Sequence, residues 1–349
     1  MKIALITDTH FGVRKGDQAL HNHFENFYKN TFFPYLQKHN IKTIIHLGDI
    51  FDVRKNIDYW SLKWVRNVVL DPIREMGASM TVLAGNHDVF YKNTNEVNSP
   101  DLLLGGYQNI EVISEAQTKI FDKLPIFLIP WINPENYNSV MRHINNTQAN
   151  IAMGHLEISG FIAHQGYVCE TGLDRDIFSS KFKKTLSGHF HHRNNDGKIF
   201  YLGNPYQMYW NDYGDTRGFH IFDTENTRMN FIKNPYNFFH KIFYNDSKES
   251  YYNFDLEEYK NTNVKLIVEH KSDNTQFDYF TSALQDIVVD LKIIEELTQD
   301  NFSIQDVDLE HEDTLTVLEK CVDEYSEEYD IVAIKKIMKS LYKEAISIG

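Results

Sequence analysis

Short runs of apolar residues recur through the first 230 residues and alternate with longer stretches of mixed polarity. The runs are rich in β-branched side chains and end at turn-forming residues, which is typical of buried strands. The predicted strands are Lys2–Thr7, Ile41–Leu47, Met80–Leu83, Ile126–Ile129, Ile151–Met153 and Thr185–Leu186. Stretches between them, such as Asn22–Lys38 and Asn56–Met76, have helical spacing. The alternation predicts a layered α/β or α+β domain over residues 1–235.

The pattern changes after about residue 235. Residues 246–263 are polar and rich in tyrosine, which predicts a linker. Two strands, Val264–Glu269 and Ile287–Ile294, flank a helix at Phe277–Gln285, so residues 236–298 are expected to form a small α/β domain. Residues 299–349 form a third region, an acidic connection followed by two amphipathic helices. Their apolar positions are Leu315, Leu318, Val322 and Tyr325, then Ile331, Ile334, Met338, Leu341 and Ala345.

The chain of 349 residues has a net charge of −14, and residues 301–349 carry half of it. It shows no basic stripe, so a polyanionic substrate would need bound cations, local basic spots or a partner protein. No apolar run reaches the roughly 18 residues of a membrane span. The two cysteines, Cys169 and Cys321, exclude a disulfide framework, and a cytoplasmic location is expected.

Five polar clusters follow predicted strands directly. They are Asp8-Thr9-His10, Gly48-Asp49-Ile50-Phe51-Asp52, Gly85-Asn86-His87-Asp88, Gly154-His155 and Gly188-His189-Phe190-His191. Any one of these histidines alone would be read as a surface or core residue. Together the clusters supply oxygen and imidazole ligands without cysteine, which suits Mn²⁺, Fe²⁺ or Zn²⁺. Ligands gather at the carboxyl ends of strands in α/β sheets, so a metal site is expected there.

The motifs D-x-H, GD-x-x-D, GNHD, GH and GH-x-H, in this order, resemble those of the calcineurin-like metallophosphoesterases over about residues 1–205. The resemblance implies a two-layer β-sandwich flanked by helices, with a site for two divalent metal ions. It implies that one ion is held by Asp8, His10, Asp49 and His191. The second would be held by Asp49, Asn86, His155 and His189, with Asp49 as the bridge that offsets repulsion between the cations.

His87 follows an implied ligand, and adjacent side chains diverge, so it is expected to face the substrate rather than a metal. There it would stabilise the transition state or protonate the leaving oxygen. A carboxylate should orient its ring. Asp52 is the first candidate, because related phosphoesterases pair this residue with the GNH histidine. Asp88 is the second, with a helix cap as its alternative role.

A finer resemblance is to SbcD-type nuclease subunits, including the recombination endonuclease subunits of T-even-like phages. The matching segments are Ile6–Gly12, His46–Asp52, Leu83–Asp88 and Tyr201–Pro205. The resemblance implies a double-strand DNA exonuclease and single-strand endonuclease, in which two ions, expected to be Mn²⁺, activate water. It also implies a subunit of an SbcCD-like recombination and repair complex, located in the host cytoplasm if the source is viral.

The resemblance also implies two protein partners besides DNA, an ATPase and a second copy of the chain. The small α/β domain would be a capping domain, and the C-terminal helices would bind an SMC-like ATPase of the SbcC type. The helix at Asn56–Met76 would form half of a homodimer bundle. Its apolar positions are Trp60, Trp64, Val65, Val68, Val69 and Ile73, and an ordinary core helix is the alternative.

Cations near the motifs are candidate phosphate contacts, with solvated surface residues as the alternative. They are Arg14, Lys15, Arg54 and Lys55, and further along the chain Lys181, Lys183 and Lys184. Two other functions remain open. One is a different metallophosphoesterase, such as a nucleotide phosphodiesterase or a protein phosphatase, although Asp52-Val53-Arg54 lacks the D-R-G of the phosphatases. The other is a non-catalytic scaffold, against which all the implied ligand positions are filled.

Overall fold

The computed structural model describes residues 1–164 and 167–295. Its larger part contains two six-stranded sheets, and the first has the order β14-β13-β1-β2-β3-β4. The strands of this sheet are β1 (Lys2–Ile6), β2 (Thr43–His46), β3 (Ser79–Leu83), β4 (Ile110–Ile113), β13 (Gly218–Asp223) and β14 (Met229–Lys233). The four strands β1 to β4 run parallel, whereas β13 is antiparallel to β1 and β14.

The second sheet has the order β11-β12-β10-β7-β6-β5. Its strands are β5 (Gln117–Phe121), β6 (Leu124–Ile129), β7 (Ile151–His155), β10 (Lys184–Gly188), β11 (Asn194–Asn195) and β12 (Ile199–Tyr201). The central strands β6, β7, β10 and β12 are parallel, and the edge strands are antiparallel to their neighbours. A separate hairpin joins β8 (Ile162–His164) to β9 (Tyr167–Val168).

Both faces of the central strands are buried, which explains their continuous apolar runs. On β1, Ile3 and Leu5 enter the core between the sheets, whereas Ala4 and Ile6 pack on the other face. Leu128 and Met153 reach the same core between the sheets from the second sheet. The structure therefore confirms the predicted two-layer β-sandwich of mixed α/β class.

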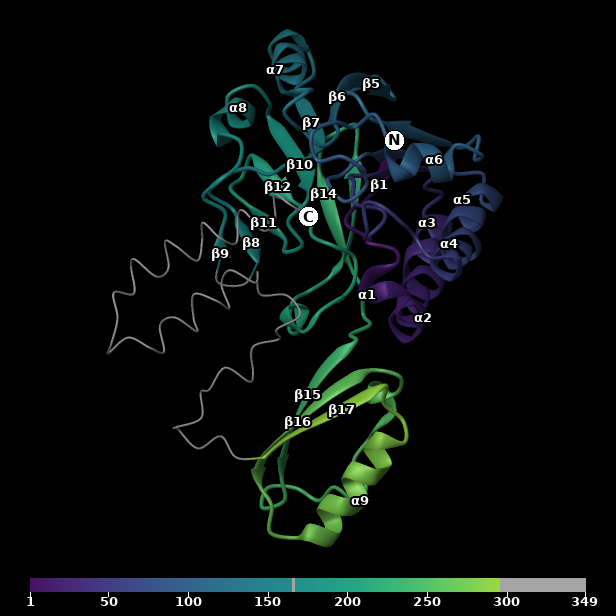
Figure 1. The fold of residues 1–349 in the computed structure, drawn as a ribbon, viewed down its shortest axis with the longest axis vertical. Coiled ribbons are helices and arrows are strands. Elements are labelled where there is room, and N and C mark those ends of the chain that lie inside the picture. The colour runs from purple at the N-terminus through teal and green to yellow at the C-terminus, as the bar shows by residue number, and fades with distance from the viewer. Residues whose placement is uncertain (165–166, 296–349) are drawn as a thin grey trace, which may run out of the picture.

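Helices cover the outer faces of both sheets (Figure 1). The helices over the first sheet are α1 (Val13–Gly16), α2 (Gln18–Phe27), η1 (Tyr28–Phe32), α3 (Phe33–Lys38), α4 (Tyr59–Val65), η2 (Arg66–Leu70) and α5 (Asp71–Glu75), with α6 (Ser99–Leu104) beside β4. The second sheet is flanked by α7 (Tyr137–Asn146) and α8 (Arg175–Ser179). The segments η1 and η2 are π-helical, so the predicted helices at residues 22–38 and 56–76 each continue through a π-turn.

The apolar positions assigned to a dimer bundle serve the protein's own core. Trp64, Val65, Val69 and Ile73 are buried there, and Trp60 packs against the same cluster. Phe24 of α2 stacks on Tyr206 in that cluster, with ring centroids 3.6 Å apart. These side chains therefore follow the core-helix alternative, and a dimer would need other residues.

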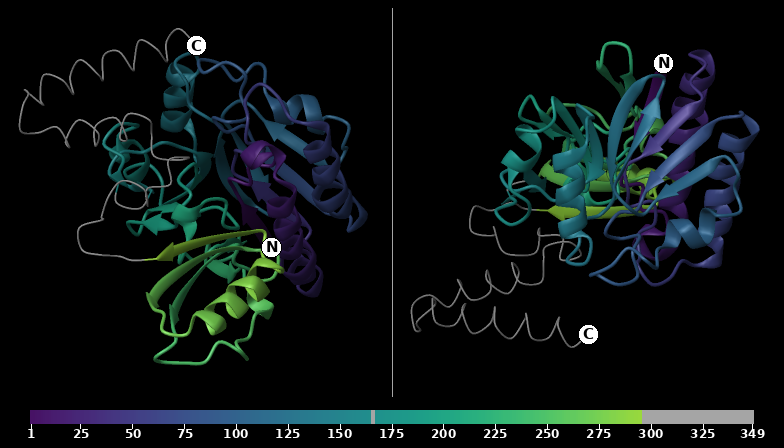
Figure 2. Two further views of the ribbon diagram at one scale, coloured as in Figure 1. Left: turned by 60° about the horizontal axis from the view of Figure 1, so that its bottom comes forward. Right: turned by 90° about the horizontal axis from the view of Figure 1, so that it is seen from above.

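A small unit follows the two-sheet body. Its parallel sheet has the order β15-β16-β17, formed by β15 (Phe239–Asn245), β16 (Asn263–His270) and β17 (Asp290–Glu295). Helix α9 (Asn274–Gln285) covers one face of it (Figure 2). The predicted strands and helix of this region are confirmed with shifted ends, whereas β15 was not anticipated. The limits of the three predicted domains stay a prediction.

The linker predicted at residues 246–263 is wrong. This segment crosses from β15 to β16 within the small unit and contains the 3-10 turn η4 (Glu257–Tyr259). Tyr251 and Tyr259 are buried in the core of the unit, where the Tyr251 ring stacks on Tyr244 with centroids 4.2 Å apart. Tyrosine here supplies packed aromatic rings with a hydrogen-bonding end, so its abundance signals a core rather than a linker.

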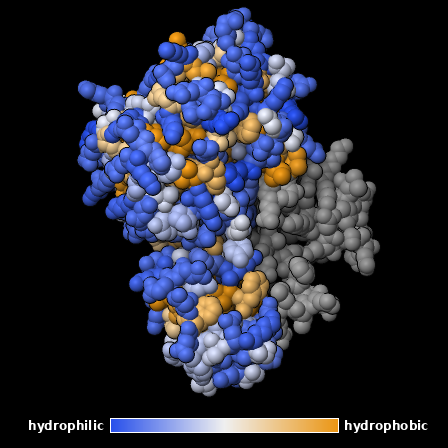
Figure 3. Space-filling view, turned by 180° about the vertical axis from the view of Figure 1, so that it is seen from behind, coloured by the Kyte–Doolittle hydropathy of each residue, from blue (hydrophilic) through white to orange (hydrophobic). Residues whose placement is uncertain are grey.

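The small unit contacts the body through the segment around the 3-10 turn η3 (Trp210–Asp212). Gln207 accepts hydrogen bonds from the backbone N–H groups of Phe238 and Phe239, and the Trp210 and Phe239 rings lie 4.8 Å apart. Seen from behind, both parts carry groups of hydrophobic side chains among hydrophilic ones (Figure 3). In the described residues no helix is both long and apolar enough to cross a membrane. The predicted C-terminal helices lie outside the described residues.

Candidate metal centre

Five strands end at the same edge of the sandwich. In the first sheet β1, β2 and β3 are parallel neighbours, and in the second β7 and β10 are parallel neighbours. Parallel strands bring their carboxyl ends to one edge of a sheet. The residues at or just after these ends are Asp8, Asp49, Asn86, His155 and His189, which come from distant parts of the sequence.

The chain turns sharply at these positions. Asp8, His10, Asp49 and His189 all have positive φ, between 44° and 87°. This conformation is costly for residues with a Cβ and is concentrated at functional sites. Gly48 has φ of 99°, and a Cβ there would lie 2.4 Å from His155 Nδ1. The loops therefore accept strain to bring their polar side chains together.

One group of potential ligands consists of Asp8, His10 and His191, whose donor atoms lie within 4.8 Å of one another. The Nε2 atoms of His10 and His191 face each other at 3.1 Å. The Asp8 carboxylate is buried and accepts the backbone N–H of His189 at 3.0 Å. This hydrogen bond connects the end of β1 in the first sheet to the end of β10 in the second.

A second group surrounds Asn86 and consists of Asp49, His155 and His189. The Asn86 Oδ1 atom lies 2.8 Å from both His155 Nε2 and His189 Nδ1. His155 Nδ1 lies 2.8 Å from the carbonyl of Leu47 and donates to it, which leaves Nε2 free to act as a ligand. Such anchoring of the second ring nitrogen is typical of metal-binding histidines.

Asp49 lies between the two groups. Its Oδ2 atom is 3.2 Å from His155 Nε2 and 3.8 Å from His10 Nε2. Its Oδ1 accepts the backbone N–H of His87 at 2.7 Å. This buried carboxylate is therefore close to a histidine of each group, and its role as a bridge between two cations stays a prediction.

The surroundings of His87 differ from the expected carboxylate pairing. His87 Nδ1 lies 2.6 Å from the backbone carbonyl of Asp52 and donates to it. The Asp52 carboxylate instead lies 3.2 Å from His10 Nδ1. Asp52 therefore orients His87 through its main chain and His10 through its side chain. The Asp88 carboxylate accepts backbone N–H groups of Asp49 and Gly85 rather than contacting the His87 ring. No helix of the described residues begins beside Asp88, so its helix-cap alternative is wrong.

Charge is balanced within the cluster by the histidines. Burial opposes ionisation of Asp49, but the imidazole of His155 holds the pKa of that carboxyl well below its usual value. Burial likewise opposes protonation of His155 and His10, yet Asp49 and Asp52 respectively raise their pKa values to about 9. Burial lowers the pKa of His189 to about 3. The buried carboxylates thus attract positive charge, which protons supply here and which divalent cations would supply instead.

The donor set fits divalent metal ions. Carboxylate, amide and imidazole groups converge without a thiolate, and neutral imidazoles such as His189 are the form that binds metals. The two groups of ligands, joined by Asp49, match the division of Asp8, His10 and His191 from Asn86, His155 and His189 that the motifs imply. A third group contains His10, Asp49 and His87, so His87 lies within the cluster rather than beside it.

The predicted phosphate contacts differ in their placement. Arg54 is half-buried, and its Nη1 atom is buried without a hydrogen-bond partner. Lys55 Nζ lies 5.9 Å from the centre of the Phe90 ring. Arg14 and Lys15 lie in α1, after the Asp8–His10 loop. Lys184 begins β10, whose other end adjoins the site, so Lys181, Lys183 and Lys184 lie at the opposite end of the sheet.

Three further residues support the cluster and were not found from the sequence. Glu157 Oε2 lies 3.7 Å from His189 Nε2, and the Trp131 ring lies 5.3 Å from the His189 ring. The buried Arg217 donates a hydrogen bond to the carbonyl of His191. Glu157 follows the end of β7 by two residues, outside the strand, so strand alternation does not predict its contact with His189. No sequence signal marks Arg217 either.

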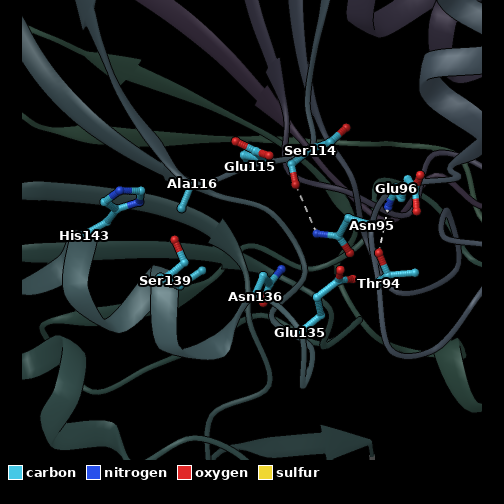
Figure 4. Close-up of a pocket in the computed structure, with 11 residues that line it drawn as sticks. Thr94, Asn95, Glu96, Ser114, Glu115, Ala116, Glu135, Asn136, Ser139 and His143 are labelled. Carbon is cyan, nitrogen blue, oxygen red and sulfur yellow. Dashed lines mark hydrogen bonds between the residues drawn. The ribbon is translucent and has the colours of Figure 1, made fainter.

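A cavity of about 530 Å³ is lined by residues of the segments 94–96, 114–116 and 135–143 (Figure 4). Asn95 lines it and donates to the carbonyls of Ser114 and Trp131. Its wall also carries Glu115, Glu135 and His143. None of the predicted metal ligands lines this cavity, so it is separate from the cluster.

Comparison with known proteins agrees with the geometry. Residues 1–205 match the family described as calcineurin-like phosphoesterase. The chain is 31% identical over 348 residues to exonuclease subunit 1 of Enterobacteria phage T4, covering 99% of both chains. It is 22% identical over 204 residues to the DNA double-strand break repair protein Mre11 of Sulfolobus acidocaldarius, covering 56% of this chain and 51% of that protein.

Among solved structures, an archaeal phosphodiesterase shares 15% identity and covers 67% of this chain and 100% of its own, with a TM-score of 0.34. That score is too low to carry an argument, so the assignment depends on the family match and on the phage relative. The family match includes every residue of the cluster up to His191. The chain belongs to the calcineurin-like phosphoesterase family.

Proposed function

We propose that this phosphoesterase is a DNA nuclease subunit that hydrolyses phosphodiesters at the cluster around Asp49. The observation that carries the proposal is the convergence of two ligand groups on one buried bridging carboxylate. The full-length similarity to a phage exonuclease subunit supports DNA as the substrate. The expected activities are exonuclease on duplex DNA and endonuclease on single strands.

The chain's own residues suggest a division of roles. Asp8, His10 and His191 would hold one divalent ion, expected to be Mn²⁺, and Asn86, His155 and His189 the other, with Asp49 shared. Bound there, the two ions would supply Lewis acidity that stabilises the charge of a phosphodiester attacked by water.

His87 is the candidate proton donor. Its Nδ1–H is committed to the Asp52 carbonyl, which leaves Nε2 as the atom that can carry a proton to the leaving oxygen. The Asp52 carboxylate would keep His10 in the orientation in which Nε2 faces His191. Arg54, half-buried with one unpartnered nitrogen, is the candidate phosphate contact among the four cations predicted beside the motifs.

Strand pairing in the small unit places lysines side by side that are far apart in the sequence. Lys241, Lys265 and Lys292 are in register across the three strands of its sheet, on the face away from α9. Lys241 and Lys265 lie over the rings of Tyr213 and Trp210, at 4.9 and 4.3 Å from the ring centres. Neighbouring strands are roughly 4.8 Å apart, so the row places three cations side by side. We infer that this row adds local positive charge that favours a polyanionic substrate despite the net charge of −14, although Lys241 and Lys265 also pack on rings of the body.

The partners remain part of the proposal. The similarity to an exonuclease subunit and to Mre11 supports an SbcCD-like complex, in which the C-terminal helices would bind an ATPase of the SbcC type. A homodimer would need a surface other than the buried positions of α4, η2 and α5. The candidate surface is a groove of about 170 Å³ whose apolar lining includes Val53, Val97 and Leu102 and which also carries Arg54. Leu102 is 73% exposed there, so Leu102→Glu should convert a dimer into a monomer in light scattering, whereas a monomeric wild type would contradict the homodimer.

The nuclease proposal is tested with end-labelled linear duplex DNA and Mn²⁺. The wild type should degrade the duplex, and His87→Ala should lower the rate by about 100-fold or more, since proton transfer contributes on that scale. His143→Ala is the matched control, because His143 is exposed on α7 beside the separate cavity and should leave the rate unchanged.

A second substrate isolates the role of His87. Bis(p-nitrophenyl) phosphate has a leaving group that departs without a proton, so His87→Ala should slow its hydrolysis far less than that of DNA. Equal losses on both substrates would exclude the proton-donor role. Hydrolysis of this ester without any DNA degradation, even with an SbcC-type ATPase present, would favour a nucleotide phosphodiesterase. No hydrolysis of either substrate would favour a scaffold.

A further inference from the structure

Asp88 is a fully buried carboxylate whose hydrogen bonds all go to backbone N–H groups of the ligand loops. Its Oδ2 atom accepts from Asp49 at 2.8 Å and from Gly85 at 2.8 Å. Its Oδ1 atom accepts from Ile50 at 3.1 Å and from Phe51 at 3.2 Å. A carboxylate offers about four acceptor sites, so this one is satisfied entirely by main chain.

These hydrogen bonds join the Gly48–Asp52 motif and the Gly85–Asp88 motif in both directions. The Asp49 carboxylate accepts the N–H of His87, while the Asp88 carboxylate accepts the N–H of Asp49. Asp49 has φ of 55°, a left-handed conformation that is unfavourable for a residue with a Cβ. A Cβ on Gly85 would meet Asp49 N at 2.3 Å, so the two loops are already as close as a glycine allows.

We infer that Asp88 is a positioning residue that fixes the bridging carboxylate of Asp49 and thereby the distance between the two metal ions. Its carboxylate contacts main-chain N–H groups, so it acts through the backbone of the Asp49 turn. An amide in its place could not do the same, because its NH₂ group would point at N–H donors instead of accepting from them. The inference rests on the proposed metal centre.

The test measures metal binding rather than activity. Mn²⁺ titration and electron paramagnetic resonance of the full chain report affinity and the exchange coupling of two adjacent ions. In Asp88→Asn the second Mn²⁺ should bind about 10–100-fold more weakly, the range known for residues that orient metal ligands, and the coupled signal should disappear. Asp88→Glu restores the charge, so it should recover part of the coupling with an altered strength.

A matched control comes from the small unit. The Asp246 carboxylate accepts the backbone N–H groups of Ser272 and Asp273 at 2.6 and 2.7 Å, so Asp246→Asn breaks the same kind of contact away from the cluster. It should lower thermal stability and leave the coupled signal intact. A coupled signal and an Mn²⁺ affinity in Asp88→Asn within twofold of the wild type would overturn the inference. If Asp88→Asn does not fold, an unaltered coupling strength in Asp88→Glu would overturn it instead. A wild type that binds no pair of ions would instead refute the metal centre itself.

Discussion

The edge of the sandwich and the small unit each contain a carboxylate that accepts backbone N–H groups, but the pKa of the two carboxyls shifts in opposite directions. Asp88 and Asp246 each accept hydrogen bonds from the backbone of a turn. Burial, and then the nearby Asp49, raise the pKa of Asp88 to about 7. The backbone N–H of Asp273 lowers the pKa of Asp246 to about 2, and His270 supports it at 2.7 Å.

The difference lies in the neighbours of each carboxylate. At the sandwich edge Asp8, Asp49 and Asp88 are all buried close together, and histidines whose pKa values are raised compensate only part of their charge. In the small unit the buried Gln276 side chain accepts hydrogen bonds from the hydroxyl of Ser250 at 3.0 Å and from the N–H of Tyr251 at 2.8 Å, so these donors are satisfied without an added ion. Buried carboxylates with too few positive neighbours favour the binding of a cation. Buried polar groups that are hydrogen-bonded to one another instead favour the stability of the folded state.

The largest expected effect comes from the residue shared by both ligand groups. Asp49→Asn removes the bridging charge and should lower the rate of Mn²⁺-dependent phosphodiester hydrolysis by more than about 100-fold. Mutation of a residue that only orients a metal ligand typically lowers activity by up to about 100-fold, and loss of a ligand should cost more. Steady-state rates on bis(p-nitrophenyl) phosphate measure it. Asp246→Asn, in the small unit, should hydrolyse the ester at the wild-type rate. A comparable loss in both variants would erase the contrast between the regions.

Metal addition should stabilise the body through the same residue. At a Mn²⁺ concentration 100 times the dissociation constant, a single site adds about 2.7 kcal/mol to the free energy of unfolding. Thermal unfolding with Mn²⁺ and with a chelator should therefore differ for the wild type, while Asp49→Asn should show little difference. An equal metal-dependent shift in Asp49→Asn would place the bound ions elsewhere.

Breaking a matched pair in the small unit should cost stability alone. Gln276→Ala leaves the buried N–H of Tyr251 without its acceptor, which costs about 1–3 kcal/mol. Chemical denaturation measures the loss, and the hydrolysis rate per folded molecule should be unchanged. Gln18→Ala, at an exposed position of α2, controls for removal of a glutamine side chain. A fall in turnover would show that the unit contributes to the site.

The smallest effect concerns the junction between the regions. His23 of α2 is buried with its ring 5.1 Å from that of Phe238, and burial, followed by the nearby His240, lowers its pKa to about 4. The unfolded state binds the proton at its ordinary pKa near 6.5 and the folded state does not, so stability falls as the pH drops below 6.5. Between pH 7 and pH 6 the loss is about 0.7 kcal/mol. It should be absent in His23→Gln, and an unchanged pH slope would mean that His23 is not buried in this way.

Much of this site follows from sequence, because each motif adjoins a buried strand whose apolar run is easy to identify. Asp8 follows β1 and Asp49 follows β2, so parallel pairing alone predicts that they meet. The fold class was predictable for the same reason. The antiparallel strand β13 carries a histidine within its buried run, and the edge strand β14 is only partly buried; both were missed.

The sequence does not predict in which direction each side chain of the site points. Asp52 sends its carboxylate to His10 and only its carbonyl to His87, a choice made by the loop's three-dimensional path. The apolar stripe of α4 and η2 looks the same whether it meets a second subunit or its own core. Tyr251 and Tyr259 stand in a segment whose sequence resembles a polar linker, and only the structure shows that they are buried in the core with residues of β16 and α9.

The central claim is that Asp49 is shared by two metal ions, and anomalous diffraction from Mn²⁺-soaked crystals tests it most directly. Two anomalous peaks are expected on either side of the Asp49 carboxylate, one against Asp8, His10 and His191 and one against Asn86, His155 and His189. Their separation should be about 3.5–4 Å. A single peak, or peaks that do not contact Asp49, would contradict the account.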